Sequence, residues 1–418
     1  MTLPSSGSTQ ETFYAVGLEV SKRTPLSGQH RFDAVVVGAG YAGVSAALTF
    51  AEAGMSVIVL EKDRVASGAS GRNGGILLLS EGTHLADPEQ SSGVDDTLGA
   101  AAQELFQLME EHKIDADARR GSLRLAITSG QAKQLAKAAR SAGETTSGRS
   151  YLDQDALREH IRSDRYVGGL HERDNIALNP HRLLEGLASL AERRGAVIAE
   201  DSEVVEVQTS SDSIVVRTAA GEVKARRMVV AAGAGTGKVL SWRRQQLMVG
   251  FSQIAVTDPI PADLLESVLP SWVATSEIAT FSRYFRRLPD NRLLFGISTL
   301  FESISGDRLE ERIRRELRDT FPALGDVLFN YSWEGEVAST IEETPLLDRI
   351  APSAVVTSSN GVLPSWNTGR IAAQATDPRY ASYDVVRSHR HRSWPPLGLP
   401  DTLVRRGAKV FFALKDRI

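Results

Sequence analysis

The sequence predicts an α/β protein with two parts, a central parallel sheet covered by helices and a second, mainly antiparallel sheet. Three observations lead to this fold class. Residues 33–61 contain a buried strand, a glycine-rich turn, a helix and another buried strand, the βαβ pattern of a parallel sheet. Residues 204–232 contain short strand-like runs typical of an antiparallel β-meander that ends in a buried strand. Residues 244–331 contain long strand-like runs and one charged helical segment, which predict the antiparallel part.

The turn in the βαβ unit has the sequence Gly38-Ala39-Gly40-Tyr41-Ala42-Gly43. In such a unit the first glycine permits the tight turn, the second lets the backbone approach a pyrophosphate, and the third allows close packing of helix on strand. Glu61 lies 23 residues after Gly38, where a carboxylate can bind both hydroxyls of an adenosine ribose and would repel a 2′-phosphate. We therefore expect a Rossmann-like domain that binds FAD or NAD, not NADP.

The loop Gly68 to Gly75, with the sequence GASGRNGG, favours FAD over NAD. Its four glycines expose backbone N–H groups that can follow a pyrophosphate and a flavin ring edge. Arg72 could stabilise an anionic reduced ring, or it could only tie the loop to a neighbouring carboxylate. An ordinary flexible Gly/Ser loop is the alternative to a flavin loop. The predicted FAD contacts in this half of the chain are Gly38, Gly40, Tyr41, Ala42, Gly43, Glu61, Lys62, Ser70, Gly71, Arg72, Asn73 and Gly74.

These motifs resemble the D-amino-acid oxidase superfamily of FAD-dependent amine and amino-acid oxidases, in particular its bacterial branch similar to gamma-glutamylputrescine oxidase. The resemblance covers nearly the whole chain. Its further motifs are Phe13-Tyr14-Ala15, Pro25-Leu26, Gly121-Ser122-Leu123, Gly168-Gly169, Asn179-Pro180-His181, the segments 229–234, 284–286 and 292–296, Asn360-Gly361-Val362 and Gly369-Arg370. The resemblance implies that a hydride passes from a carbon next to nitrogen to FAD, that an imine forms, and that O2 reoxidises the flavin to give H2O2.

The resemblance also implies further cofactor contacts in the second half of the chain. They are the backbone of Val204 beside the adenine, Ala232 and Gly233 after a buried strand, and Asn360, Gly361 and Val362 before a C-terminal helix. Val204 can equally be a simple core valine. Relatives carry glycines at the positions of Val356 and Ser359, so these substitutions can narrow the pocket or alter the substrate. With no cysteine in the chain and no histidine in the loop, FAD is expected to bind without a covalent link.

Tyr284 and Arg286 are the candidate catalytic residues. The resemblance places Tyr284 as a wall of the pocket, and Arg286 could pair with a substrate carboxylate through two hydrogen bonds. Alternatively, strand alternation could leave some of Arg283, Arg286 and Arg287 on a solvated face.

The sequence leaves the electron acceptor and the class of activity open. Leu294 stands where related oxidases carry a lysine that assists oxygen reduction. A dehydrogenase with another acceptor, a specialised biosynthetic flavoenzyme and a non-catalytic FAD-binding protein therefore stay open. An aromatic hydroxylase should show a Gly-Asp pair near the C-terminal flavin motif, where this chain has Gly361-Val362.

The composition agrees with an amine-oxidising enzyme. The net charge of -4 and a pI near 6.1 argue against nucleic-acid binding. Zero cysteines exclude disulfides and iron-sulfur clusters, and no metal site is expected, since His389 and His391 have no acidic neighbour. The first 30 residues lack the apolar core of a signal peptide, so we expect a cytoplasmic protein.

The 418 residues suggest about two domains. We expect a discontinuous FAD-binding domain formed by residues 1–85, 175–240 and 333–385, and a substrate domain formed by residues 86–174 and 241–332. Residues 386–418 form a basic tail. Its apolar residues could form a membrane-surface helix, but packing onto the body of the protein is the more frequent explanation of such a pattern. The sequence does not indicate an oligomeric state.

Overall fold

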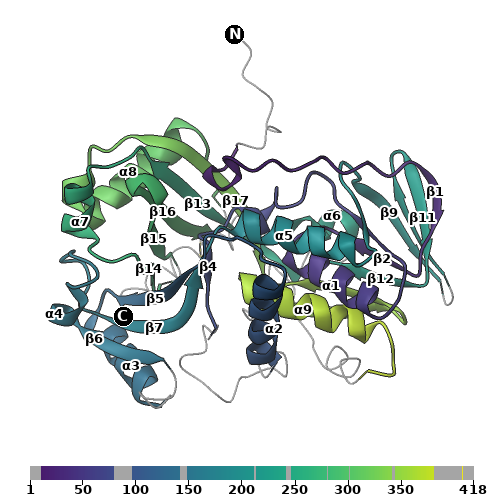
Figure 1. The fold of residues 1–418 in the computed structure, drawn as a ribbon, viewed down its shortest axis with the longest axis horizontal. Coiled ribbons are helices and arrows are strands. Elements are labelled where there is room, and N and C mark those ends of the chain that lie inside the picture. The colour runs from purple at the N-terminus through teal and green to yellow at the C-terminus, as the bar shows by residue number, and fades with distance from the viewer. Residues whose placement is uncertain are drawn as a thin grey trace, which may run out of the picture.

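The computed structural model describes residues 11–79, 97–141, 148–210, 213–241, 246–279, 281–300, 302–340 and 344–380, and residue 407. The basic tail apart from residue 407, together with His389 and His391, thus lies outside the described residues. The described residues form three sheets. Figure 1 shows the parallel sheet and a small sheet in one half of the molecule and a large, mainly antiparallel sheet in the other. The predicted fold class is confirmed.

The parallel sheet has the strand order β18-β19-β12-β2-β3-β8. Neighbouring strands from β19 to β8 run parallel, and only β18 is antiparallel to its neighbour. The inner strands are continuous apolar runs because helices cover one face of this sheet and the small sheet covers the other. The strands are β2 (Ala34–Val37), β3 (Val57–Leu60), β8 (Val197–Ala199), β12 (Arg227–Val230), β18 (Leu346–Ala351) and β19 (Ala354–Ser358).

The helices of this half pack closely on the parallel sheet. An added Cβ at Gly369 of α9 would lie 2.1 Å from the carbonyl oxygen of Ala42 in α1, so the two helix backbones touch. Helix α5 begins after Asn179, whose side chain accepts from the N–H groups of His181 and Arg182 in the first turn. The helices are α1 (Tyr41–Glu52), α2 (Leu98–Glu111), α5 (Pro180–Arg193), α6 (Thr236–Val239) and α9 (Val362–Ala375).

The small sheet has the order β1-β11-β10-β9. Its strands β9 (Val204–Thr209), β10 (Ile214–Thr218) and β11 (Gly221–Ala225) form the predicted antiparallel meander. Strand β1 (Gly28–Arg31) pairs in parallel with β11 and was not predicted. All four of its residues are exposed, so its sequence has no apolar alternation that could have indicated a strand.

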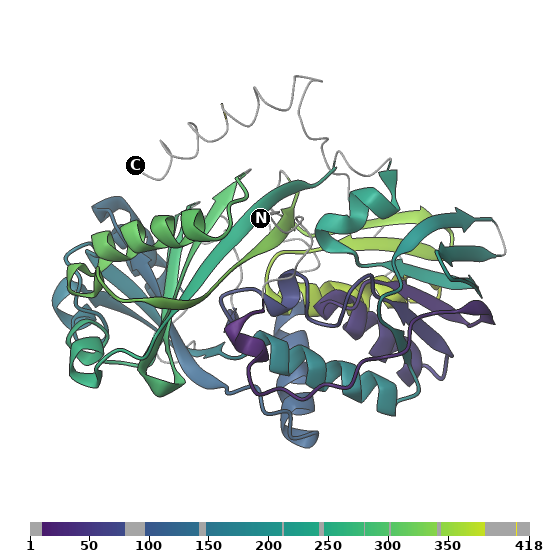
Figure 2. The same cartoon turned by 90° about the horizontal axis from the view of Figure 1, so that it is seen from above.

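The large sheet has the order β17-β13-β16-β15-β14-β5-β7-β4, and β6 pairs with β7. Helix α8 (Asp307–Thr320) lies across one face, as Figure 2 shows, and buries Leu309, Ile313 and Leu317 against it. The strands are β4 (Ile76–Leu77), β5 (Arg119–Ala126), β6 (Arg149–Asp153), β7 (Gly168–Ala177), β13 (Met248–Thr257), β14 (Ala274–Glu277), β15 (Arg283–Leu288), β16 (Arg292–Leu300) and β17 (Phe329–Ser339). The remaining α-helices are α3 (Ser129–Ser141), α4 (Gln154–Leu157) and α7 (Ala262–Val268).

Short 3-10 turns join these elements. They are η1 (Phe13–Ala15), η2 (Ala69–Gly71), η5 (Gly233–Gly235), η7 (Pro289–Asn291) and η8 (Pro322–Leu324). The division into domains stays a prediction, and strands β7 and β17 cross its borders at residues 174 and 332. Within the described residues, no helix is both long enough and apolar enough to cross a membrane.

Candidate active site

The carboxyl ends of β2, β3, β12 and β19 meet at one edge of the parallel sheet. From β2 the chain builds outward to β3 and β8 on one side, and β12 and β19 lie on the other side. The position between β2 and β12 is therefore the topological switch point, where α/β sheets bind ligands. Gly38 has φ of 99°, and an added Cβ there would lie 2.5 Å from the carbonyl oxygen of Ala231. The turn that precedes Ala232 and Gly233 thus touches the first glycine turn.

The start of α1 shows why the other two glycines are needed. An added Cβ at Gly43 would lie 1.8 Å from the carbonyl oxygen of Gly38, which leaves room only for glycine. An added Cβ at Gly40 would lie 2.8 Å from Ser70 Oγ, which accepts from the N–H of Tyr41 at 3.2 Å. The helix has no side-chain cap at Gly40 and no acidic residue in its first turn. Its positive end is therefore suited to a diphosphate.

Glu61 lies at the end of β3 and already braces the glycine turn. Its carboxylate accepts from the N–H groups of Ala39 at 2.7 Å and Asp63 at 3.1 Å. Burial raises the pKa of Glu61. The neighbouring Lys62 forms an exposed ion pair with Asp63 at 2.9 Å. Glu61 is thus placed for the predicted ribose contact, whereas the ammonium of Lys62 is paired with Asp63.

Hydrogen bonds give the Gly68 to Gly75 loop a defined shape. The Asn73 amide donates to the carbonyl oxygens of Ala69 and Ser70 and accepts from the N–H of Gly75. An added Cβ at Gly71 would lie 2.0 Å from the carbonyl oxygen of Ala66, so this position is closed to larger residues. This network argues against an ordinary flexible Gly/Ser loop.

Arg72 joins the loop to the large sheet. Its guanidinium donates to the carbonyl oxygens of Ser67 at 2.9 Å and Glu334 at 3.1 Å, and burial lowers its pKa. Glu334 belongs to β17, so this contact links the two halves of the molecule. The predicted contact of Arg72 with FAD stays a prediction.

Tyr284 packs directly on the loop from β15 and is 8% exposed. Added Cβ atoms at Gly74 and at Gly296, its cross-strand partner, would lie 2.8 Å and 2.2 Å from its ring. Its hydroxyl lies 2.5 Å from Ser252 Oγ, and burial raises its pKa. The phenol is therefore neutral at physiological pH and offers a hydrogen bond beside the loop, not a base.

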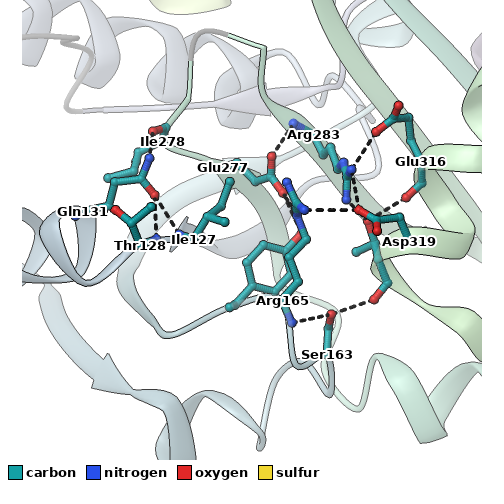
Figure 3. Close-up of polar contacts among 12 residues, drawn as sticks. Ile127, Thr128, Gln131, Ser163, Arg165, Glu277, Ile278, Arg283, Glu316 and Asp319 are labelled. Carbon is teal, nitrogen blue, oxygen red and sulfur yellow. Dashed lines mark hydrogen bonds and ion pairs between the residues drawn. The ribbon is translucent and has the colours of Figure 1, made fainter. Parts of the chain in front are cut away.

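Arg286 is buried, with 4% of its surface exposed. Its Nε donates to the carbonyl oxygen of Gly74 at 3.1 Å, and its Nη2 donates to that of Leu178 at 2.8 Å. The alternative of a solvated face is wrong, because Arg283 and Arg287 are buried as well. Arg283 lies on the side of α8, where it pairs with Glu316 and Asp319 as Figure 3 shows. Pairing of Arg286 with a substrate carboxylate stays a prediction.

The C-terminal motif reaches the same edge of the parallel sheet. Gly361 has φ of 98° and precedes α9, which begins at Val362. Asn360 and Gly361 are exposed and Val362 is buried. Val356 lies inside β19 and packs in the core beneath the small sheet, so its side chain does not narrow the site.

Val204 begins β9 and is buried in the same core. This agrees with the core-valine interpretation of its side chain. The contact of its main chain with the adenine stays a prediction.

Comparison with known proteins identifies the family. The family described as "DAO: FAD dependent oxidoreductase" matches residues 33–375. The chain belongs to this family. It is 31% identical over 400 residues to Gamma-glutamylputrescine oxidoreductase of Escherichia coli (strain K12), covering 92% of this chain and 93% of that protein. It is 29% identical to Probable oxidoreductase OrdL of Haemophilus influenzae, over 84% of each chain.

Solved structures show the same fold for this FAD-dependent oxidoreductase. Glycine oxidase from Geobacillus kaustophilus superimposes with a TM-score of 0.70 at 20% identity, covering 86% of this chain and all of that one. The predictions of the family and of FAD as cofactor are confirmed.

The residues of this FAD-dependent oxidoreductase fit the cofactor. The glycine turn and the open end of α1 leave backbone space and positive potential for a diphosphate. In the described part of the chain, the N–H groups of Asn73 and Gly74 have no hydrogen-bond partner. Donors of this kind suit the acceptor atoms of a flavin ring.

Two contributors to the site were missed in the sequence. Tyr14 was noted only as part of a motif, yet its hydroxyl donates to the carbonyl oxygen of Asn73. Trp333 donates from Nε1 to the carbonyl oxygen of Arg72. Tyr14 lies 59 positions and Trp333 lies 261 positions from these acceptors, so no local pattern could have indicated the contacts.

Proposed function

We propose that this FAD-dependent oxidoreductase oxidises the C–N bond of a primary or secondary amine, or of an amino acid, to an imine, with O2 as electron acceptor and H2O2 as product. The observation that carries the proposal is the 31% identity, over 92% of the chain, to a relative named Gamma-glutamylputrescine oxidoreductase. The position of Tyr284 against the loop at Gly74 supports a substrate site on this face of the large sheet.

FAD, when bound, supplies a two-electron acceptor for the hydride on the carbon next to the nitrogen. The residues of the chain bind and orient the substrate and exclude water from the site. Tyr14, Tyr284 and Trp333 form a buried apolar cluster beside the loop. Such walls disfavour an ammonium ion and so favour the neutral amine that can lose a hydride. The raised pKa of Tyr284 keeps its proton in place, so it can orient the substrate through a hydrogen bond but does not remove a proton.

A dehydrogenase with another electron acceptor is the second candidate. The observation that favours it is Leu294, which replaces the lysine of related oxidases and is fully buried in the same cluster. No cation is therefore supplied at this position to assist oxygen reduction. Catalysis with O2 would depend on another cation, or it would be slower.

A screen of amines and amino acids tests both candidates. The purified, yellow protein is mixed anaerobically with each compound, including gamma-glutamylputrescine, and the flavin absorbance is recorded. Bleaching identifies a substrate. Peroxide on admission of air then indicates an oxidase, and reoxidation only by an artificial acceptor indicates a dehydrogenase. A flavin that no amine or amino acid bleaches would contradict the proposal.

The same preparation tests the absence of a covalent link. We expect acid denaturation to release all the yellow colour into the supernatant, because no cysteine is available for a thioether. Colour that stays with the precipitated protein would contradict this expectation.

A further inference from the structure

Three consecutive carbonyl groups of the flavin loop each accept a hydrogen bond from a different, distant side chain. The donors lie in η1, β15 and β17, and each is at least 59 residues away from its acceptor in sequence. The pairs are Trp333 Nε1 with Arg72 O at 3.0 Å, Tyr14 Oη with Asn73 O at 2.9 Å and Arg286 Nε with Gly74 O at 3.1 Å. We call these three donors the carbonyl clamp.

The donors of the carbonyl clamp hold one another in place. The rings of Tyr14 and Trp333 meet edge to face at 5.4 Å, and the two residues are 1% and 0% exposed. Arg286 donates to the Tyr14 hydroxyl at 3.4 Å, and the Asn179 amide donates to the Tyr14 carbonyl oxygen at 3.0 Å. Figure 1 shows η1 at the junction of the two halves of the molecule. The carbonyl clamp is therefore a buried, mutually bonded unit and not three separate contacts.

The planarity of the peptide bond gives the carbonyl clamp a consequence for the N–H groups. In a trans peptide the C=O and the following N–H point in opposite directions. The carbonyl clamp holds Arg72 O and Asn73 O on its own side. The N–H groups of Asn73 and Gly74 therefore point to the opposite side. Neither of these two N–H groups has a hydrogen-bond partner within the described residues, whereas the next one, at Gly75, is taken by the Asn73 side chain.

We propose that Tyr14 and Trp333 are positioning residues that aim the N–H groups of Asn73 and Gly74 at acceptor atoms of the flavin ring, and that Arg286 holds Tyr14 and the next carbonyl oxygen, that of Gly74, in place. This inference deepens the proposed function, and it rests on FAD binding at this loop. Fixed N–H donors stabilise negative charge without reorganisation. The carbonyl clamp therefore favours reduced over oxidised FAD and so raises the reduction potential of the bound cofactor.

Tyr14→Phe and Trp333→Phe test the carbonyl clamp, because each removes one donor and keeps an aromatic ring. Tyr331→Phe is the matched control. Its ring packs against Phe13 at 5.5 Å beside the same apolar cluster, and its hydroxyl makes no hydrogen bond within the described residues. The FAD dissociation constant and, at saturating FAD, the midpoint potential and visible spectrum are measured for all three variants.

We expect Tyr14→Phe and Trp333→Phe each to raise the FAD dissociation constant about 5-fold, as the loss of one hydrogen bond implies. We also expect both to lower the preference for reduced over oxidised FAD about 3- to 10-fold, seen as a lower midpoint potential and an altered spectrum. Tyr331→Phe should change neither quantity.

A merely structural role would weaken binding or lower the melting temperature and leave the potential of bound FAD unchanged. That result in both variants would overturn the inference. If Tyr14→Phe fails to fold, Trp333→Phe decides the question. A wild-type protein that binds FAD and oxidises no amine would contradict the proposed function alone, since the potentials would still test the carbonyl clamp.

Discussion

Replacement of Arg286 by glutamine should destabilise the flavin loop and weaken FAD binding. The buried guanidinium donates to the carbonyl oxygens of Gly74 and Leu178 at 3.1 Å and 2.8 Å. A hydrogen bond to a charged group contributes about 1.5 to 3 kcal/mol, and glutamine can replace at most one of the two. We therefore expect Arg286→Gln to lower the free energy of unfolding by about 2 to 4 kcal/mol. Urea denaturation measures this change, and flavin fluorescence quenching measures an expected rise of tenfold or more in the FAD dissociation constant.

Arg283→Gln is the matched control for this prediction. Arg283 lies on the same strand and is also buried, but it pairs with Glu316 and Asp319 on the side of α8 (Figure 3). Arg283→Gln should destabilise the protein and leave the affinity for FAD unchanged. Comparison of the two variants thus separates general destabilisation from a specific effect on the loop.

Substrates with and without a carboxylate distinguish two roles of Arg286, which are to hold the flavin loop and to pair with a substrate carboxylate. Because its Nε and Nη2 already bind carbonyl groups of the protein, we expect Arg286→Gln to lower kcat/KM for both kinds of substrate by a similar factor. Unchanged FAD affinity together with a loss confined to carboxylate-bearing substrates would refute this reasoning. That result would instead establish Arg286 as the partner of a substrate carboxylate.

Two further predictions concern the cofactor site and pH. Gly40→Val should abolish FAD binding in a fluorescence titration, because an added Cβ already lies 2.8 Å from Ser70 Oγ where the diphosphate is expected; wild-type affinity would contradict this placement. Burial, with Arg64 and Arg72 nearby, lowers the pKa of His181 from 6.5 to about 4, so the folded protein disfavours the charged form. The contribution of neutral His181 to the free energy of unfolding should be fully present above pH 6.5. The free energy of unfolding should then fall by up to about 3 kcal/mol as the pH drops to 4. In urea unfolding, His181→Gln should reduce the dependence of the free energy of unfolding on pH between 4 and 6.5. An unchanged pH dependence in this variant would exclude His181 as its cause.

The parts of the fold that the sequence predicted depend on local physics. Gly38, Gly40 and Gly43 lie within six consecutive residues, and their spacing together with the apolar strands and helix around them indicated the βαβ unit. The start of α5 has a local cause of the same kind, because the Asn179 side chain accepts from N–H groups two and three positions ahead of it. The meander was predicted from short strand-like runs, and buried residues in β10 and β11 indeed recur at every second position.

The placement of the arginines in β15 could not be obtained in this way. Alternation predicts a solvated face only when the second face of the sheet is open, and here α8 covers it. The carboxylates that pair with Arg283 and the backbone carbonyls that accept from Arg286 come from other segments of the chain. The apolar spacing of Leu309, Ile313 and Leu317 was a usable signal for a helix that buries one side against the sheet. It could not have indicated which strand that helix covers.

The two ends of the cofactor are therefore expected to be held by different kinds of structure. The diphosphate end depends on the glycine turn and Glu61, which lie within one βαβ unit. The ring end depends on the carbonyl clamp, whose donors come from three separate segments and whose acceptors are backbone carbonyls. Changes in the βαβ unit remove space for the cofactor, so they should act on whether FAD binds. Changes in the carbonyl clamp alter the direction of N–H groups, so they should weaken FAD binding and also change the potential of the FAD that is bound.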